Sequence, residues 1–430
     1  MMLYLDNAGW TAAQDAADAD LIIVNSCGFI ESAKQESINA VLGWRRLYAD
    51  KKILLSGCLA QRYAQELAQS LPEADSFFGI DDIANIVEKA ESLTGNKGRR
   101  PAAGEHYSPS SRPLLSLPGS AYVKISEGCD NGCTFCAIPL IRGPLRCRTL
   151  PDIVSECKGL LARGIKELCI IGQDIGSYRS GNAGLPELLN AIAELSGNFW
   201  VRLLYIHPDH FPLSILDSIE QDRRFLPYFD IPFQHASPEI LSAMNRRGTA
   251  ESYISLVEII RCRLPAAVIR TTFLTGFPGE TDADFAALLD FQERLRSDWL
   301  GCFSYSREEG TPAYTMKGRV SKKNAVRRKR KIEERQILIT EKNMARFAGQ
   351  NLDVLLEERF AGSTGDIESD NENAGEDLWL GRLYCHAPEV DGAAVIVGTA
   401  GRTELKAGDL LPCRVVARRG IDLEVRLAKN

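Results

Sequence analysis

The chain has 430 residues, of which 45% are hydrophobic and 25% are charged. This composition is typical of a soluble globular protein, and the length exceeds that of one ordinary core, so we expect two or three domains. No run of eighteen apolar residues is present and the acidic start lacks the basic segment of a signal peptide, so we expect a cytoplasmic protein with no membrane partner. In that compartment the twelve cysteines are expected to be metal ligands or buried thiols rather than disulfides.

The net charge of −6 is unevenly distributed along the chain. Residues 351–430 contain nine Lys and Arg against fifteen Asp and Glu, whereas the remaining residues contain 42 of each kind. All of the excess acid therefore lies in the C-terminal segment, which favours a basic partner over an RNA there.

Residues 1–92 are predicted to form an α/β domain with a parallel sheet. Two apolar runs, ADLIIVNS and KKILLSG, have the pattern of strands, and each is followed by a segment with helical spacing. Strands separated by helices pair in parallel, so Cys27 and Cys58 are each expected just past the carboxyl end of a strand, where ligands bind. Two buried thiols at strand ends are the alternative interpretation.

The next stretch, 93–118, is rich in Pro, Ser, Gly and Arg and is predicted to be a linker. Residues 119–345 then repeat a strand–helix unit about six times. Six units fall short of the eight of a closed barrel, so we expect an open (β/α)6 partial barrel, with catalytic groups at the carboxyl ends of its strands. The predicted strands are AYVKIS, ELCIIGQD, WVRLLYIH, PYFDIPFQH, VIRTTFLTGF and GCFSYSREEG. The polar residues near their ends are Ser126, Gln173, Asp174, His207, Gln234, His235, Thr275, Ser306 and Arg307.

The end of the chain has a different pattern. A charged helix is expected over 321–347, and its basic run could bind nucleic acid, although a solvated connecting helix is the simpler interpretation. Short strands and turns over 348–427 predict a small all-β barrel. The acidic insert at 363–377 is expected to be a mobile loop.

Three cysteines lie close together in SEGCDNGCTFCAIPL, namely Cys129, Cys133 and Cys136. Thiolates at this spacing can bind zinc or an iron–sulfur cluster. A structural zinc site needs four ligands, and no fourth one follows closely. Three ligands on a four-iron cluster instead leave one iron open, which suits a site that binds a substrate, and this loop follows the first predicted barrel strand.

Cys-x3-Cys-x2-Cys with an aromatic residue, Phe135, before the last cysteine resembles the signature of the radical S-adenosylmethionine superfamily. The resemblance implies that the open iron binds S-adenosylmethionine, which is cleaved to methionine and a 5′-deoxyadenosyl radical. Five further stretches resemble the methylthiotransferases of that superfamily: VNSCGFIESAKQES, LLSGCLAQRY, GCDNGCTFCAIPLIRGPLRCR, FDIPFQHASPEILSAMNRRG and TTFLTGFPGET. That family has an N-terminal domain with a second [4Fe-4S] cluster, a radical domain and a C-terminal TRAM barrel.

In the second cluster, Cys27 and Cys58 match two ligands of the family pattern. The family supplies a third cysteine from an earlier strand, and no cysteine precedes Cys27 in this sequence. We therefore expect the natural protein to begin upstream of Met1 with a strand and a cysteine-containing turn. The chain that begins at Met1 is expected to bind about four irons rather than eight and to transfer sulfur poorly.

Pieces such as GPLRCR and APEVDG resemble the RimO-type class, which methylthiolates an aspartate β-carbon in the twelfth small-subunit ribosomal protein. The implied partners are that protein, an electron donor and a sulfur donor, with tRNA an unlikely substrate. The alternatives are methylthiolation of an adenosine in tRNA and a non-catalytic iron–sulfur module that binds RNA. Phe135 and Gln173 are the expected cofactor contacts, no catalytic side chain is assigned, and His207, His235 and Arg307 receive no role. The remaining cysteines are expected to be buried or incidental: Cys147, Cys157, Cys169, Cys262, Cys302, Cys385 and Cys413.

Overall fold

The computed structural model describes residues 1–97, 112–360, 378–399 and 404–428, and it divides into two compact units. Unit 1 consists of residues 1–113, 127–146 and 306–316, and unit 2 consists of residues 114–126, 147–305 and 317–430. The predicted acidic insert lies outside the described residues, as does the larger part of the predicted linker. Within the described ranges, no helix combines the length and the hydrophobicity that crossing a membrane requires.

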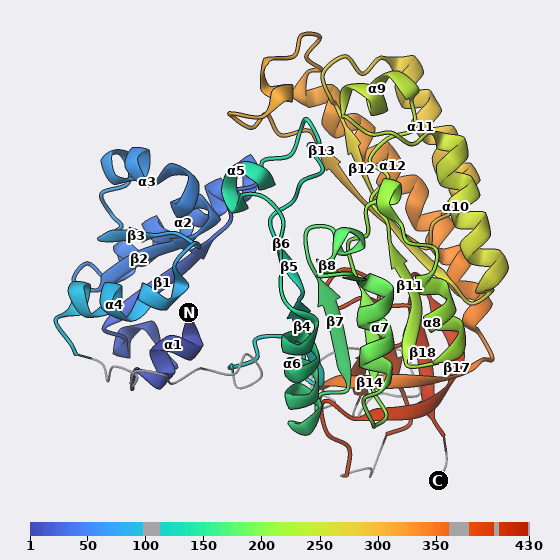
Figure 1. The fold of residues 1–430 in the computed structure, drawn as a ribbon, viewed down its shortest axis with the longest axis horizontal. Helices are drawn as coiled ribbons and strands as arrows, with labels where there is room; N and C mark the ends of the chain where they lie inside the picture. The colour runs from blue at the N-terminus through green and yellow to red at the C-terminus, as the bar shows by residue number, and fades with distance from the viewer. Residues whose placement is uncertain (98–111, 361–377, 400–403, 429–430) are drawn as a thin grey trace, which may run out of the picture. The chain divides into compact units, whose positions relative to one another are not determined.

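Unit 1 is built on a parallel three-stranded sheet in the order β1-β2-β3. The middle strand is buried on both faces, as its continuous apolar run predicts, and Ile53, Leu54 and Leu55 are fully buried. The sheet and its helices are seen in blue in Figure 1. The elements are α1 (Met2–Asn7), β1 (Leu21–Ser26), α2 (Glu31–Leu47), β2 (Lys52–Gly57), α3 (Cys58–Ser70), β3 (Ser76–Phe78), α4 (Ile86–Thr94) and α5 (Ile138–Arg142).

Residues 306–316 are fastened into unit 1 by one buried carboxylate. Glu308 Oε2 lies 2.7 Å from Arg62 Nη1 and 3.1 Å from Lys34 Nζ. Further along the segment, the backbone N–H of Ala313 donates to the carbonyl of Thr134 at 2.9 Å. The segment therefore binds both to the helices beside the small sheet and to the loop that carries three of the cysteines.

Unit 2 contains the predicted six-stranded parallel sheet, in the order β13-β12-β11-β10-β7-β4. The open sheet confirms the partial barrel expected from six strand–helix units. Its strands are β4 (Ser120–Lys124), β7 (Glu167–Ile171), β10 (Trp200–Leu203), β11 (Phe225–Asp230), β12 (Val268–Thr275) and β13 (Trp299–Ser304). Its helices are α6 (Leu150–Ala162), α7 (Leu185–Ala193), α8 (Ile215–Gln221), α9 (Pro238–Ala243), α10 (Ala250–Arg263), α11 (Asp282–Leu295) and α12 (Lys322–Met344). Two short pairs, β5 (Ser126–Glu127) with β6 (Arg146–Cys147) and β8 (Arg179–Ser180) with β9 (Ala183–Gly184), complete the strands before the C-terminal barrel.

The C-terminal strands close into the small barrel that the sequence predicts, in the order β14-β15-β16-β18-β17. The barrel strands are β14 (Asn351–Phe360), β15 (Leu378–Arg382), β16 (Ala394–Ile396), β17 (Leu410–Arg419) and β18 (Asp422–Leu427).

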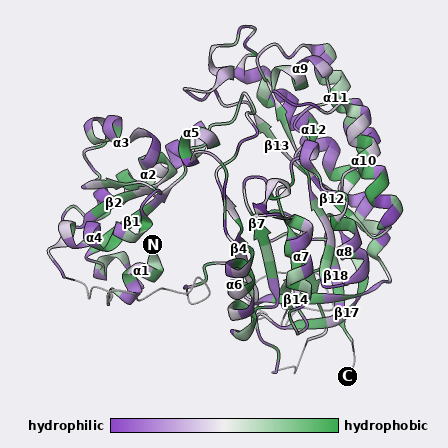
Figure 2. Ribbon diagram, viewed as in Figure 1, coloured by the Kyte–Doolittle hydropathy of each residue, from purple (hydrophilic) through white to green (hydrophobic). Residues whose placement is uncertain are grey.

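The hydropathy of the large sheet differs from that of the charged helix. Figure 2 shows the strand β7 of the large sheet in the green of apolar residues, and charged residues colour parts of α12 purple.

A buried ionic network joins this barrel to the large sheet within unit 2. Glu167 of β7 accepts from Arg202 Nε at 2.7 Å and from Arg382 Nη2 at 2.5 Å, and Ser120 Oγ donates to it at 2.8 Å. Burial alone would raise the pKa of Glu167, but the two guanidinium groups outweigh it and hold that pKa at about 2. The barrel is thus docked on the sheet by a buried ionic contact as well as by apolar packing.

Candidate functional site

Cys27 and Cys58 lie at neighbouring strand ends in unit 1, as predicted. The strands β1 and β2 pair in parallel with Ser26 opposite Gly57, so the next residue of each strand is a cysteine. The backbone N–H of Cys27 donates to Ser37 Oγ at 3.3 Å, and Cys58 is the first residue of α3. The amino end of a helix carries a partial positive charge, so Cys58 lies at the positive end of α3.

Two glycines allow these turns to approach each other closely. Gly57 has φ of 105°, and a Cβ atom there would lie 2.5 Å from the carbonyl oxygen of Ser26. A Cβ atom on Gly28 would lie 2.7 Å from the carbonyl oxygen of Cys58. Neither contact is possible for a larger residue without backbone movement, so glycine is required to hold the two cysteine turns together.

Arg142, which the sequence analysis did not single out, contacts Cys58. Its Nη2 lies 3.3 Å from Cys58 Sγ, and its Nη1 donates to Glu127. Glu127 precedes the loop of three cysteines and Arg142 ends the helix α5 that follows it. The ion pair therefore closes the base of that loop while the other end of the guanidinium reaches a cysteine of the small sheet. The only local sequence signal is an arginine before the glycine of IPLIRG.

We call residues 129–136, which contain Cys129, Cys133 and Cys136, the cysteine loop. It belongs to unit 1, and all three cysteines are partly buried. The N–H of Cys136 donates to the carbonyl of Cys133 at 3.1 Å, and the N–H of Cys129 donates to that of Gly143 at 3.3 Å. Phe135 is also partly buried. Unit 1 therefore contains all five cysteines that the sequence analysis proposes as cluster ligands.

The thiols are not arranged as a finished metal site. Across the described part of the chain, no group of three His, Cys, Asp or Glu side chains is placed to hold a metal ion. The chemistry of the cysteine loop nevertheless fits an iron–sulfur cluster, because three soft thiol donors share one short loop.

In unit 2, several strand ends carry polar atoms that are buried without a protein partner. Ser126 Oγ, Gln173 Oε1 and Ser304 Oγ have no hydrogen-bond partner among the described residues. They follow or end β4, β7 and β13. Buried polar atoms are nearly always satisfied, so such atoms at the ligand-binding edge of a sheet fit an absent ligand.

The other polar residues at strand ends have local structural tasks. His207 Nδ1 accepts from the N–H of Asp209 at 3.2 Å, and burial lowers its pKa to about 3. His235 is fully buried, and its Nδ1 accepts from the N–H of Ser237 at 3.1 Å, whereas its Nε2 has no hydrogen-bond partner among the described residues. Arg307 belongs to unit 1, where its guanidinium lies 3.7 Å from the centre of the Tyr314 ring.

The remaining cysteines are mostly core residues. No disulfide joins any of the twelve cysteines. Cys262 is exposed and Cys147 is partly buried, whereas the others lie in the core: Cys157, Cys169, Cys302, Cys385 and Cys413.

Backbone strain marks two further positions at the strand ends of unit 2. Tyr205 and Gln234 have φ of 67° and 70°, a region that residues with a Cβ atom rarely adopt. They follow the neighbouring strands β10 and β11. Such strain is concentrated at functional sites, but it leaves no signal in an amino-acid sequence.

Comparison with known proteins agrees with this architecture. The sequence model of the radical SAM superfamily matches residues 123–291, that of the TRAM domain matches 348–427, and that of the uncharacterized protein family UPF0004 matches 1–79. A radical S-adenosylmethionine methyltransferase, TsrM from Kitasatospora setae, whose structure has cobalamin and a [4Fe-4S] cluster bound, superposes with a TM-score of 0.51. It is 19% identical and covers 69% of this chain and 66% of its own, so it shows the fold alone.

Several relatives carry the description ribosomal protein uS12 methylthiotransferase RimO. The one from Treponema denticola is 43% identical, over 98% of this chain and 95% of its own length. Those from Carboxydothermus hydrogenoformans and Thermodesulfovibrio yellowstonii are 38% and 35% identical, over 96% and 98% of this chain and 91% and 93% of theirs. With a domain order and a cysteine loop that agree with this similarity, the chain belongs to the RimO family of radical S-adenosylmethionine methylthiotransferases.

Proposed function

We propose that this enzyme replaces a hydrogen on the β-carbon of an aspartate in ribosomal protein uS12 with a methylthio group. One S-adenosylmethionine supplies the methyl group. A second is reductively cleaved to methionine and the 5′-deoxyadenosyl radical, which removes the hydrogen atom and becomes 5′-deoxyadenosine. The observation that carries the proposal is the cysteine loop, in a chain similar to RimO proteins over nearly its full length.

The three thiols of the cysteine loop would hold a [4Fe-4S] cluster after turning toward one another. When bound, a cluster with one open iron supplies the electron that cleaves S-adenosylmethionine. Gln173 is proposed to contact this cofactor, because its buried amide oxygen has no partner in the described part of the protein. Phe135 is proposed as an apolar neighbour of the same cofactor.

Cys27 and Cys58 are proposed as ligands of a second cluster, through which sulfur reaches the substrate. Their neighbouring strand ends and the guanidinium of Arg142 beside Cys58 support this assignment. Arg142 and the amino end of α3 both place positive charge where an anionic sulfur ligand would lie. A sulfur donor and an electron donor, both separate from this chain, complete the reaction in the cytoplasm.

The electrostatic case for a basic protein substrate rests on one segment. Residues 361–377 contain six acidic and no basic residues, so they account for all of the excess charge of the C-terminal region. Complementary charge of this kind accelerates encounter with a basic protein more than it strengthens the final complex.

The first experiment offers both candidate substrates to one enzyme. The anaerobically reconstituted protein, S-adenosylmethionine and a reductant are incubated with isolated uS12 and with tRNA, and both products are analysed by mass spectrometry. Because this chain is expected to transfer sulfur poorly, we expect a minor fraction of uS12 to gain the mass of one methylthio group less one hydrogen, on an aspartate. Methylthiolation of tRNA with no change in uS12 would establish the tRNA-modifying alternative. No 5′-deoxyadenosine from any mixture would favour the non-catalytic module.

The second experiment removes the acidic segment alone. Phe360 and Leu378 are opposite each other in the antiparallel pair β14–β15, so Asn-Gly can join them as a two-residue hairpin in place of 361–377. The association rate with uS12 should fall and become less sensitive to salt. A second variant keeps the length of 361–377 and changes its six acidic residues to Asn and Gln, so it separates the effect of charge from that of loop length. An unchanged association rate in both variants would reject charge steering.

A further inference from the structure

The charged helix predicted from the sequence has one face packed into unit 2 and one face in solvent. Ala325, Ile332 and Ile339 are buried against the rest of the unit, together with the long side chains of Arg328 and Gln336. The exposed side of its first three turns is strongly basic, because 322–331 contains seven Lys and Arg and no acid. The function proposed above makes no use of this basic run.

Some of these cations are neutralised within the protein and others are not. Lys329 and Arg330 pair with Glu333 and Glu334 one turn further on, and Arg328 pairs with Asp282 and Glu280. Lys323, Arg327 and Lys331, which we call the basic face, have no carboxylate within 4.0 Å in the described residues. Their spacing of four residues places them in one row along the helix.

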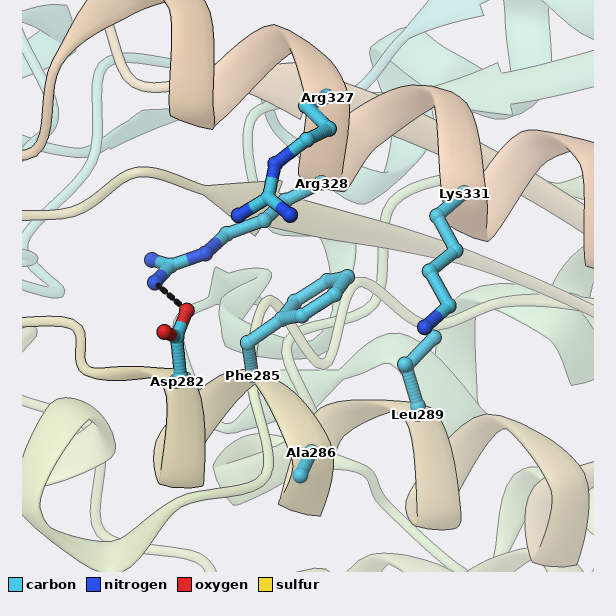
Figure 3. A pocket seen from close by; sticks show the side chains of 7 residues that line it. All are labelled: Asp282, Phe285, Ala286, Leu289, Arg327, Arg328 and Lys331. Atoms are coloured by element: carbon cyan, nitrogen blue, oxygen red, sulfur yellow. Dashed lines mark hydrogen bonds and ion pairs between the residues drawn. The ribbon is translucent and has the colours of Figure 1, made fainter.

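The basic face borders a pocket between α11 and α12. Its volume is about 250 Å³, and Phe285, Ala286 and Leu289 of α11 form an apolar wall. Figure 3 shows Arg327 and Lys331 extending from α12 toward α11, with Asp282 turned to Arg328 by the ion pair of 2.8 Å. The Asp282 carboxylate is therefore engaged by Arg328. Arg327 also attracts Asp282, but from beyond 4.0 Å, and Lys331 forms no ion pair among the described residues.

We propose that the basic face binds the phosphate backbone of RNA. Eight residues of helix span about 12 Å, so the row covers three or four successive charges of a nucleic-acid strand, which are about 3.4 Å apart along the axis. The outer two cations of the row start from backbone positions about 12 Å apart, so the row extends over more than the width of one phosphate group. The row thus matches a polyanion better than an isolated phosphate.

RNA is a more suitable polyanion here than an acidic protein. This choice rests on the proposed function, because a ribosomal protein is found beside ribosomal RNA. Contacts to phosphate position a protein without reading sequence, so such a site would hold the enzyme near its substrate on any RNA surface. The acidic segment 361–377 and the basic face would then serve different partners.

The test compares the full chain with Lys323→Ala/Arg327→Ala/Lys331→Ala. Alanine preserves the helix while removing three charges. The control, Lys158→Ala/Arg223→Ala/Lys342→Ala, removes three exposed charges elsewhere, and thermal unfolding checks the fold of both. Binding of fluorescein-labelled tRNA and of a labelled ribosomal RNA helix is measured by anisotropy over a series of salt concentrations.

We expect the slope of log K against log salt to lose about 2 to 3 units in the basic-face variant and to stay unchanged in the control. If this ionic contribution vanishes at 1 M salt, affinity at 0.1 M should fall roughly 100- to 500-fold. Equal losses on both RNAs support contact with phosphate. Binding of labelled polyglutamate, a polyanion without phosphate, is measured in the same way. Equal slopes for the variant and the control, or a loss of affinity for only one of the two RNAs, would overturn the proposal. A larger loss of affinity for polyglutamate than for RNA would also overturn it. Methylthiolation of isolated uS12 should be unaffected, so the site and the proposed function can fail separately.

Discussion

Glu167 provides the most demanding test of how the C-terminal barrel is held. Its carboxylate is fully buried and pairs with Arg202 of the sheet and Arg382 of the barrel at 2.7 and 2.5 Å. The change Glu167→Gln keeps the shape of the side chain and removes its charge, so two buried guanidinium groups lose their common anion. Breaking a buried ion pair from one side costs about 3–5 kcal/mol.

The pKa of Glu167 gives an independent magnitude. It is about 2 in the folded protein and 4.5 in the unfolded chain, which corresponds to about 3 kcal/mol of stability. Because the folded pKa is the lower one, this stability is complete above pH 4.5 and is lost as the pH falls through 2. The two values agree within their precision.

The assay is thermal unfolding at pH 7, where the loss should lower the Tm of Glu167→Gln by roughly 6–20 °C. Glu357 also belongs to this set, because it pairs with Arg382 Nε. The quadruple variant Glu167→Met/Arg202→Met/Glu357→Met/Arg382→Met removes all four charges and should recover most of this loss, since apolar replacements of a whole buried ionic group are often neutral. A Tm of Glu167→Gln within about 2 °C of the parent, or a quadruple variant less stable than the single one, would refute the reasoning.

Three further changes test the cysteines and the pH response. Alanine at any one of the three thiols of the cysteine loop should abolish cleavage of S-adenosylmethionine, whereas Cys262→Ala, an exposed thiol, should leave it intact; normal cleavage in all three would remove the central assignment. Arg142→Gln removes a positive charge 3.3 Å from Cys58 Sγ, worth at least about 1.3 kcal/mol, so iron held by Cys58 should bind about tenfold more weakly, in competition with a chelator, than in the parent or in Arg142→Lys. Burial raises the pKa of Asp391 to about 6, so the folded state retains a proton that the unfolded chain releases, and the free energy of unfolding should fall by about 3 kcal/mol between pH 4 and 6. Asp391→Asn should lack that component, and identical pH profiles of its Tm and the parent's would contradict it.

The order of elements was predictable because each one has a strong local pattern. The run KKILLSG is apolar and continuous, and β2 is a central strand buried on both faces. Cys27 and Cys58 could be placed side by side from topology alone, since parallel neighbours end at the same edge. The ligand roles of these residues, of Phe135 and of Gln173 stay predictions.

The contacts that connect distant parts of the chain could not be predicted in this way. Arg202 lies in the run WVRLL, where its charge suggests exposure, yet it is fully buried against Glu167 and the carbonyl of Tyr384. Arg142 reaches a thiol 84 residues earlier in the chain. Neither contact produces a periodic pattern or a fixed spacing in the sequence, because each depends on where tertiary packing brings two separate segments together.

The composition of unit 1 has a practical consequence for exchanging domains between relatives. Residues 127–146 and 306–316 belong to the same compact body as residues 1–113, although the segments that flank them in sequence belong to the large sheet. A chimera cut only at the linker would pair a foreign Cys58 with a native Arg142, and a foreign Arg62 with a native Glu308. A transplant that keeps these contacts has to carry three separate stretches of chain. In this protein, a segment that is continuous in sequence is therefore not the same as a unit that packs together in space.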